Sequence, residues 1–128
     1  MQPADTVRAW VDANNAYDFE SLHALYAPDA EVVCDQFGIR LNTEPARREM
    51  IAGFDAALPG GTFTPSLIVD GGTHVVLEAT YEATVAIDDM PGLPAKSELF
   101  RLPIAVVFEV REDLIRREQT YCDWPAAD

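Results

Sequence analysis

Two acidic residues with apolar neighbours are the candidates for acid–base chemistry. Asp35 ends an apolar stretch that we predict to be a strand. Partial loss of water there would raise the pKa of its carboxyl group and suit it as a general base. Glu118 lies in the last predicted strand; facing inward, it would share a cavity with Asp35, and the pair could divide into an acid and a base. The alternatives are an Asp35 that faces water and a Glu118 that pairs with Arg101 or Arg116.

Aromatic side chains around these acids predict a pocket for a flat apolar ligand. The aromatic candidates are Trp10, Tyr26, Phe54, Tyr81 and Phe108. Aromatic residues at such spacings also build ordinary cores, so a plain core is the alternative. Asn14 shares a helical stripe with Trp10, and a buried amide needs hydrogen-bond partners. We therefore add Asn14 to the predicted pocket as a polar contact.

No sequence pattern indicates a metal, a nucleotide or a catalytic serine. Cys34 and Cys122 lie far apart without the spacing of a metal or redox motif, so we expect two buried free thiols in a reducing compartment. His23 and His74 have no partner at metal spacing, and we expect both on the surface. The sequence therefore predicts no cofactor and no metal site.

The first part of the chain is predicted to form three helices and a strand. Apolar residues recur at helical spacing over residues 4–14 and 46–58, and Pro45 is a typical first-turn residue. Between them, Asp18 is a candidate N-cap for a helix that continues through Tyr26 and ends at Pro28. Residues 31–34 then form the strand that leads to Asp35.

The second part of the chain changes to the period-two alternation of strands. We predict strands at residues 62–70, 74–87, 99–110 and 114–123, with a hairpin turn at Gly71-Gly72 and a loop at 88–96. Alternation of apolar and polar residues indicates antiparallel strands with one buried and one solvated face. Helices followed by strands indicate an α+β fold, with residues 1–128 as a single domain.

The turn at Glu112-Asp113 decides which face of the last strand points inward. If Asp113 takes the left-handed conformation, a three-residue bulged turn places Glu118, Thr120 and Cys122 inside. A two-residue turn would instead turn the opposite face inward, with Arg117, Gln119, Tyr121 and Asp123. We favour the three-residue turn because aspartate tolerates that backbone conformation.

Four segments early in the chain carry a family resemblance. They are Trp10, the run Asn15-Ala16-Tyr17-Asp18, the run Leu25-Tyr26-Ala27-Pro28-Asp29-Ala30, and the run Cys34-Asp35-Gln36-Phe37-Gly38. In this order and spacing they resemble the opening of the nuclear-transport-factor-2-like superfamily, in particular its SnoaL-like polyketide cyclase and ketosteroid isomerase branches. The resemblance implies a cone: a curved antiparallel sheet wrapped around about three helices, with an internal pocket.

The resemblance also implies roles for individual residues. Asp35 falls on the proton-shuttling acid of the isomerases, and the two oxyanion-binding positions fall on Trp10 and Val106. An indole N–H donates one hydrogen bond, whereas valine donates none. The acid–base positions of the cyclases fall near Val106 and Thr120, so we include both in the predicted substrate-binding set. Residues 102–123 also resemble limonene epoxide hydrolase, whose Arg-x-Asp pair would fall near Thr80 and Glu82.

The resemblance and the candidate acids together predict a small cofactor-free enzyme. We expect isomerase, cyclase or epoxide-hydrolase chemistry on an apolar small metabolite, with Asp35 and Glu118 as the catalytic residues. The alternative is a non-catalytic small-molecule-binding or dimeric assembly module of the same fold.

The charge balance narrows the classes of partner. The 128 residues carry 22 acids and 9 bases, which gives a net charge of −13. Nucleic acids and anionic membrane surfaces attract basic proteins, so neither is an expected partner. The N-terminal residues MQPADTV lack the features of a signal peptide, and no apolar run reaches the roughly 18 residues of a membrane span. We expect a cytoplasmic protein that forms a homodimer through the solvated face of its sheet.

Overall fold

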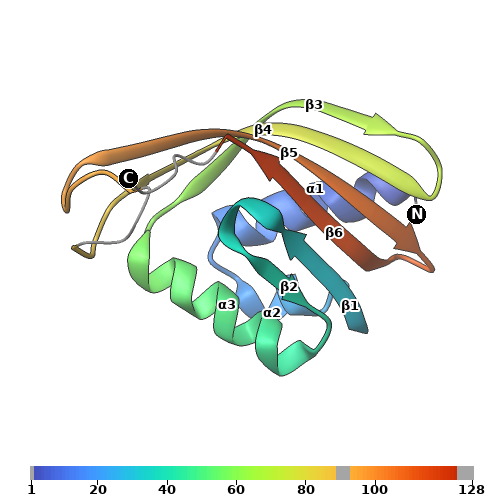
Figure 1. Ribbon diagram of the computed structural model, residues 1–128. Helices are drawn as coiled ribbons and strands as arrows, with labels where there is room; N and C mark the ends of the chain where they lie inside the picture. The colour runs from blue at the N-terminus through green and yellow to red at the C-terminus, as the bar shows by residue number, and fades with distance from the viewer. Residues whose placement is uncertain (1, 89–92, 124–128) are drawn as a thin grey trace.

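A curved six-stranded sheet encloses three α-helices in the computed structural model, which describes residues 2–88 and 93–123 (Figure 1). The helices are α1 (Pro3–Asn15), α2 (Phe19–His23) and α3 (Glu44–Ala57). The strands are β1 (Tyr26–Cys34), β2 (Ile39–Leu41), β3 (Thr62–Asp70), β4 (His74–Thr84), β5 (Leu99–Arg111) and β6 (Leu114–Cys122). The predicted α+β fold with a curved sheet around three helices is confirmed. Residues 89–92 of the predicted loop lie outside the described part of the chain.

The strand order is β2-β1-β6-β5-β4-β3, and neighbouring strands are antiparallel except for β1 and β6, which run parallel. The expectation of a wholly antiparallel sheet is therefore wrong at this one pairing. No hairpin joins β1 to β6, so chain connectivity does not force them to run in opposite directions. In Figure 1, β3, β4 and β5 arch over α1, and α3 lies against β1 on the open side of the sheet.

The helix caps follow the sequence, but α2 is shorter than predicted. The Asp18 carboxylate accepts a hydrogen bond from the Ser21 amide at 3.2 Å, as an N-cap residue does. The helix ends at His23 instead of continuing to Pro28. Tertiary pairing decides this boundary: the Ile115 amide of β6 donates to the Leu25 carbonyl at 2.8 Å, which draws the next residue into β1.

The turn between β5 and β6 differs from the prediction but gives the predicted inner face. Glu112 and Asp113 both have positive φ angles and form a two-residue turn, in which Arg111 pairs with Leu114. The predicted three-residue turn is therefore wrong. A bulge further along shifts the register, so that Glu118 pairs with Phe108 and the inward face of β6 is the predicted one.

Strands β3 to β6 lie close to their predicted positions, whereas β1 begins five residues before its predicted start and β2 was not predicted. β3 has the predicted bounds, and β4 ends at Thr84, three residues before the predicted end. Alternate residues of β4 and β5 are buried, as the sequence alternation indicated. The sheet therefore presents one face to the helices and one face to solvent, and the inner face forms one wall of the site described next.

Candidate active site

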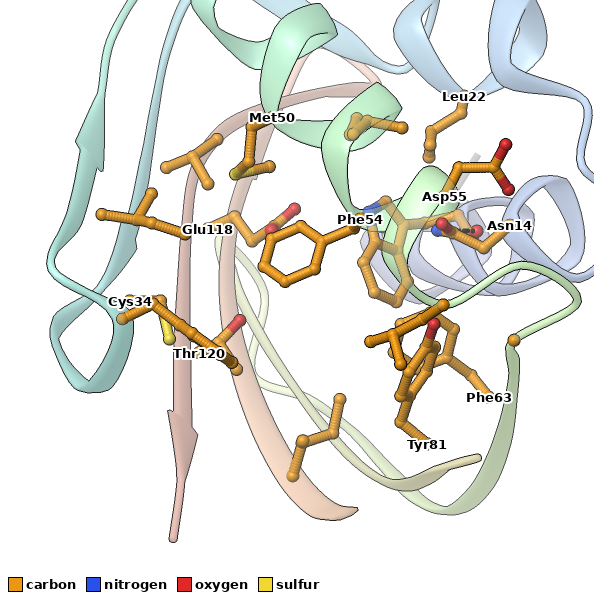
Figure 2. Close-up of a pocket in the computed structure, with 18 of the residues that line it drawn as sticks. Asn14, Leu22, Cys34, Met50, Phe54, Asp55, Phe63, Tyr81, Glu118 and Thr120 are labelled. Atoms are coloured by element: carbon orange, nitrogen blue, oxygen red, sulfur yellow. Dashed lines mark hydrogen bonds between the residues drawn. The ribbon is translucent and has the colours of Figure 1, made fainter. Parts of the chain in front are cut away.

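A cavity of about 180 Å³ lies between α1, α3 and the inner face of the sheet. This volume is slightly larger than the roughly 150 Å³ apolar cavities that hold a benzene ring, and it opens to solvent. Most of its lining is apolar, with aromatic rings from both layers (Figure 2). The structure brings seven of the predicted site residues to this lining: Trp10, Asn14, Tyr26, Phe54, Tyr81, Glu118 and Thr120.

Glu118 is the buried acid of the pocket, with only 6% of its surface exposed. β6 points it inward because the bulge before it restores the register with β5. The Tyr26 hydroxyl donates a short hydrogen bond to its carboxyl group, and the Trp10 indole N–H donates to the Tyr26 oxygen at 2.8 Å. Three residues from α1, β1 and β6 therefore form one buried polar chain that ends at a carboxyl group facing the pocket.

Burial raises the pKa of Glu118, because the low-polarity surroundings disfavour the charged carboxylate. Hydrogen bonding by Tyr26 and Trp10 and the positive charge of Arg47 lower this pKa, but by less than burial raises it. Burial also raises the pKa of Tyr26 well above its usual value, and Glu118 adds to the increase. Tyr26 therefore stays protonated and holds the carboxyl group in place, while Glu118 exchanges its proton closer to neutral pH than an exposed glutamate does.

Arg47 on α3 is a buried cation beside this chain, with 1% of its surface exposed. Its guanidinium lies over the Tyr26 ring, 4.4 Å from the ring centre. Its Nη2 atom lies 3.5 Å from the carboxylate of Glu44, but neither Nη1 nor Nη2 makes a hydrogen bond with any described residue. Burial, more than any nearby charge, lowers the pKa of Arg47.

Arg47 was not among the predicted site residues, although the sequence holds a signal for it. It occupies the apolar stripe of α3 with Met50, Ile51 and Phe54, at helical spacing. A charged residue on such a stripe indicates either a helix edge or a buried contact. The stripe alone does not show which, because the answer depends on where β1 carries Tyr26.

His23 is buried, so its predicted surface position is wrong. Its Nδ1 atom lies 3.5 Å from Nε of Arg47, which holds that ring nitrogen as an acceptor. Burial first, and then the charges of Arg48 and Arg47, lower the pKa of His23 and keep the ring neutral. His74 is exposed, as expected.

Asp35 does not lie in the pocket, so the prediction that it is a desolvated acid there is wrong. β1 ends at Cys34, and Asp35 begins a short 3-10 helix, η1 (Asp35–Phe37), that turns its side chain outward. The side chain is 65% exposed and pairs with Arg40 at 3.7 Å. Asp35, one of the two acids predicted to be catalytic, is therefore a solvated surface group.

Val106 does not line the cavity, so its predicted place in the substrate-binding set is also wrong. It is buried to 99% between Leu77 and Thr120 on the inner face of the sheet, in the part of the core that α1 covers. Trp10 packs edge-on against the neighbouring Phe108 at 5.2 Å, which fills that part of the interior. The cavity lies beside the earlier part of β5, where Ile104 lines it.

A threonine, two cysteines and an aspartate line the cavity besides Glu118. Thr120 lies two residues along β6, and its hydroxyl makes no hydrogen bond with the described residues. Neither Cys34 nor Cys122 forms a disulfide with a described residue; Cys34 is buried as predicted, whereas Cys122 is only half-buried, so its predicted burial is wrong. Asp55, which the sequence analysis did not select, lines the cavity from α3.

Among the described residues, no three metal-binding side chains lie close enough to hold an ion. In the same part of the chain, no helix has the length and apolar character needed to cross a membrane.

Comparison with known proteins identifies similar sequences and folds. Residues 7–118 match the family model of the SnoaL-like domain. Similar solved structures include IdmH of Streptomyces antibioticus, a proposed polyketide cyclase that is 26% identical, with a TM-score of 0.82 over 96% of this chain and 93% of IdmH. A SnoaL-like polyketide cyclase of Agrobacterium tumefaciens is 20% identical, with a TM-score of 0.81 over 96% of this chain and 92% of that one. AclR of Streptomyces galilaeus, a proposed hydroxylase, is 14% identical, with a TM-score of 0.80 over 95% of this chain and 79% of AclR. No functionally curated protein matches the sequence significantly.

Proposed function

The chain belongs to the SnoaL-like domain family, and on that basis we propose that it is an enzyme that carries out acid–base chemistry on an apolar small metabolite. Glu118 is the proton-transferring residue in this proposal. One observation carries it: a carboxyl group with a raised pKa is held by Tyr26 in an otherwise apolar pocket. General acids and bases work best when their pKa lies near the working pH, and burial moves Glu118 in that direction.

The favoured reaction is proton abstraction beside a carbonyl group. The Glu118 carboxylate removes a proton from the carbon next to the carbonyl, and the Thr120 hydroxyl donates a hydrogen bond to the enolate oxygen that forms. Return of the proton to a different carbon completes an isomerisation. Alternatively, the enolate carbon bonds to a second carbonyl carbon, and the proton from Glu118 passes to the resulting alkoxide, which completes a cyclisation.

Carbonyl substrates suit this pocket better than epoxides. Opening an epoxide requires a proton donor for the oxygen and a second group that activates water. Glu118 supplies one such group, but Asp35 is exposed outside the pocket and Asp55 lies on the other side of the Phe54 ring, at the solvent end of the cavity (Figure 2). A single carboxyl group is sufficient for an isomerisation or a cyclisation, because it takes up and returns the same proton.

The test compares wild-type protein with Glu118→Gln and Asp35→Asn on an aromatic enone, a cyclisable diketone and an epoxide. Glutamine keeps the size and hydrogen-bonding capacity of Glu118 but accepts no proton. We expect Glu118→Gln to lose about 10²- to 10⁴-fold in kcat on the substrate that is turned over. Asp35→Asn is the matched control and should stay within about twofold, because its carboxylate is exposed. Full activity in Glu118→Gln would refute the proposal.

A non-catalytic ligand-binding module is the second candidate. The specific observation in its favour is that Val106, on which the resemblance places an oxyanion-binding position, donates no hydrogen bond and is buried outside the cavity lining. In this case, thermal-shift measurements would show that aromatic ketones stabilise the protein, while none of the three substrates is converted. Turnover of any of them that depends on Glu118 would reject this candidate.

A further inference from the structure

The pocket has a second polar region, separated from Glu118 by the Phe54 ring. Figure 2 shows Glu118 and Thr120 on one side of this ring, and Asn14, Asp55 and Tyr81 on the other. The groups on the second side come from α1, α3 and β4, which are far apart in the sequence. The acid–base chemistry proposed above uses none of them.

The Tyr81 hydroxyl is held in place without a hydrogen bond to the described part of the chain. Its ring packs against Phe63, with the ring centres 4.8 Å apart. Its hydroxyl lies against the backbone of Gly61, where an added Cβ atom would approach it to 2.1 Å. Glycine at this position therefore leaves the space that the hydroxyl occupies. No described residue makes a hydrogen bond with the Tyr81 hydroxyl, which points toward Asn14 and Asp55 in Figure 2.

The free hydrogen-bonding groups of this region are mainly acceptors. The Asn14 amide nitrogen donates to the Trp10 carbonyl at 2.9 Å, which fixes the side chain and leaves its carbonyl oxygen without a partner among the described residues. Asp55 offers carboxylate oxygens at the solvent end of the pocket. Burial, with smaller contributions from Tyr17 and Asp55, raises the pKa of Tyr81 to about 12. Tyr81 therefore keeps its proton and can both donate and accept.

We propose that Asn14, Asp55 and Tyr81 form a second binding subsite that recognises a hydrogen-bond donor on the ligand, such as a phenolic hydroxyl group. A donor satisfies acceptors that would otherwise lose their water when the ligand enters. The inference rests on the proposed function and specifies its substrate class. The ligand is a flat compound of one or two rings, with a carbonyl group at Glu118 and a hydroxyl group at the opposite end.

The test uses two ketones that differ by one hydroxyl group: 2-acetylnaphthalene and 6-hydroxy-2-acetylnaphthalene. The 6-methoxy derivative is the third probe, because it fills the same space without a donor. Calorimetry or fluorescence titration gives the dissociation constants. We expect the hydroxy ketone to bind the wild-type protein about tenfold more tightly than the other two, the effect of one hydrogen bond with partial charge assistance.

Tyr81→Phe and Asp55→Asn should each reduce this preference to about threefold or less, because each weakens the polar region without removing a ring. Tyr121→Phe makes the same chemical change on the exposed outer face of the sheet and should leave the preference unchanged. Circular dichroism and urea denaturation verify that each variant is folded. Equal binding of the three ketones to the wild-type protein, or an unchanged preference in both pocket variants, would overturn the subsite alone. Failure of every ketone to bind would overturn the proposed function as well.

Discussion

Replacement of Arg47 by methionine should stabilise the protein while it disturbs Glu118. The buried guanidinium has lost its water, and its Nη atoms make no hydrogen bond with the described residues. Taking a charged group out of water costs several kcal/mol. Its recovered interactions are the Tyr26 ring, worth on the order of 1–2 kcal/mol, a long Nε–His23 hydrogen bond worth about 0.5 kcal/mol, and a half-exposed Glu44 that contributes at most about 1 kcal/mol.

Methionine fills a similar length of the core without a charge. The variant therefore avoids the cost of burying the guanidinium. We expect Arg47→Met to increase the free energy of unfolding by about 1–2 kcal/mol, because the cost of taking the charge out of water exceeds what the interactions of the guanidinium recover. With an unfolding entropy of about 2.1 cal/mol/K per residue, this corresponds to a rise in Tm of about 4–7 °C for a chain of this length. Urea denaturation followed by circular dichroism gives the free energy directly.

Arg48→Met is the matched control for this prediction. Arg48 is adjacent on α3, but it is partly exposed and pairs with Glu20 at 2.9 Å on the surface. Its replacement should change the free energy of unfolding by no more than about 0.5 kcal/mol. If Arg47→Met instead lost more than 1 kcal/mol, contacts of the guanidinium with Tyr26 and Glu44 would outweigh its burial, and our assessment of the buried charge would be refuted.

The same substitution of Arg47 can also be measured in a protein that carries Glu118→Gln. Arg47 lowers the pKa of Glu118 through its charge, so part of its favourable interaction is with the ionised carboxylate. Glu118→Gln removes that interaction. The gain from Arg47→Met should therefore be larger in the Glu118→Gln background than in the wild-type protein, and a smaller gain would contradict electrostatic coupling between the two residues.

Three further predictions concern Glu118, Tyr26 and the outer face of the sheet. Because the pKa of Glu118 is raised, the folded state binds more protons than the unfolded state, and stability falls as pH rises from the ordinary glutamate value of 4.5 through the folded pKa. Glu118→Gln should flatten this decline. Identical pH profiles of the free energy of unfolding, measured with urea for both proteins, would contradict a raised pKa at Glu118. Tyr26→Phe removes a hydrogen bond that lowers the pKa of Glu118, so the pKa of Glu118 should rise further. NMR titration of the Glu118 carboxyl carbon in both proteins measures this change, and an equal pKa in the two would show that the hydrogen bond has no effect. The sheet register places Leu67, Glu78, Ala105 and Tyr121 in one row on the solvent face, where Leu67 is 50% exposed and Tyr121 is 48% exposed. We expect sedimentation to show a homodimer at micromolar concentration that Leu67→Glu dissociates, and a monomeric wild-type protein would exclude pairing through this face.

The sequence predicted most of the fold, because its elements are specified by local patterns. Helical spacing identified α1 and α3, and alternation identified β3, β4 and β5 within a few residues. The prediction from helical spacing failed at the end of α2, where pairing of Tyr26 with Ile115 overrode the local pattern. The family resemblance supplied the arrangement of these elements, which periodicity does not contain.

The candidate site was predicted less well than the fold. The sequence selected Glu118 as a possible inward acid, and the structure places it in the pocket, although through a bulge rather than the expected turn. It also selected Asp35, whose direction depends on η1 immediately after β1. A shift of one residue at a strand end reverses the direction of a side chain, and sequence alternation does not resolve boundaries that finely.

The sequence by itself determined most of the helices and strands and which of their faces are apolar, because these properties depend largely on neighbours a few residues away. The tertiary structure alone decided that Glu118 meets Tyr26 and that Arg47 lies over the same ring. These contacts join β1, α3 and β6, which are brought together only when the sheet curves around the helices. Burial by distant segments then sets the pKa of Glu118, so its chemistry belongs to the assembled fold and not to any one stretch of the chain.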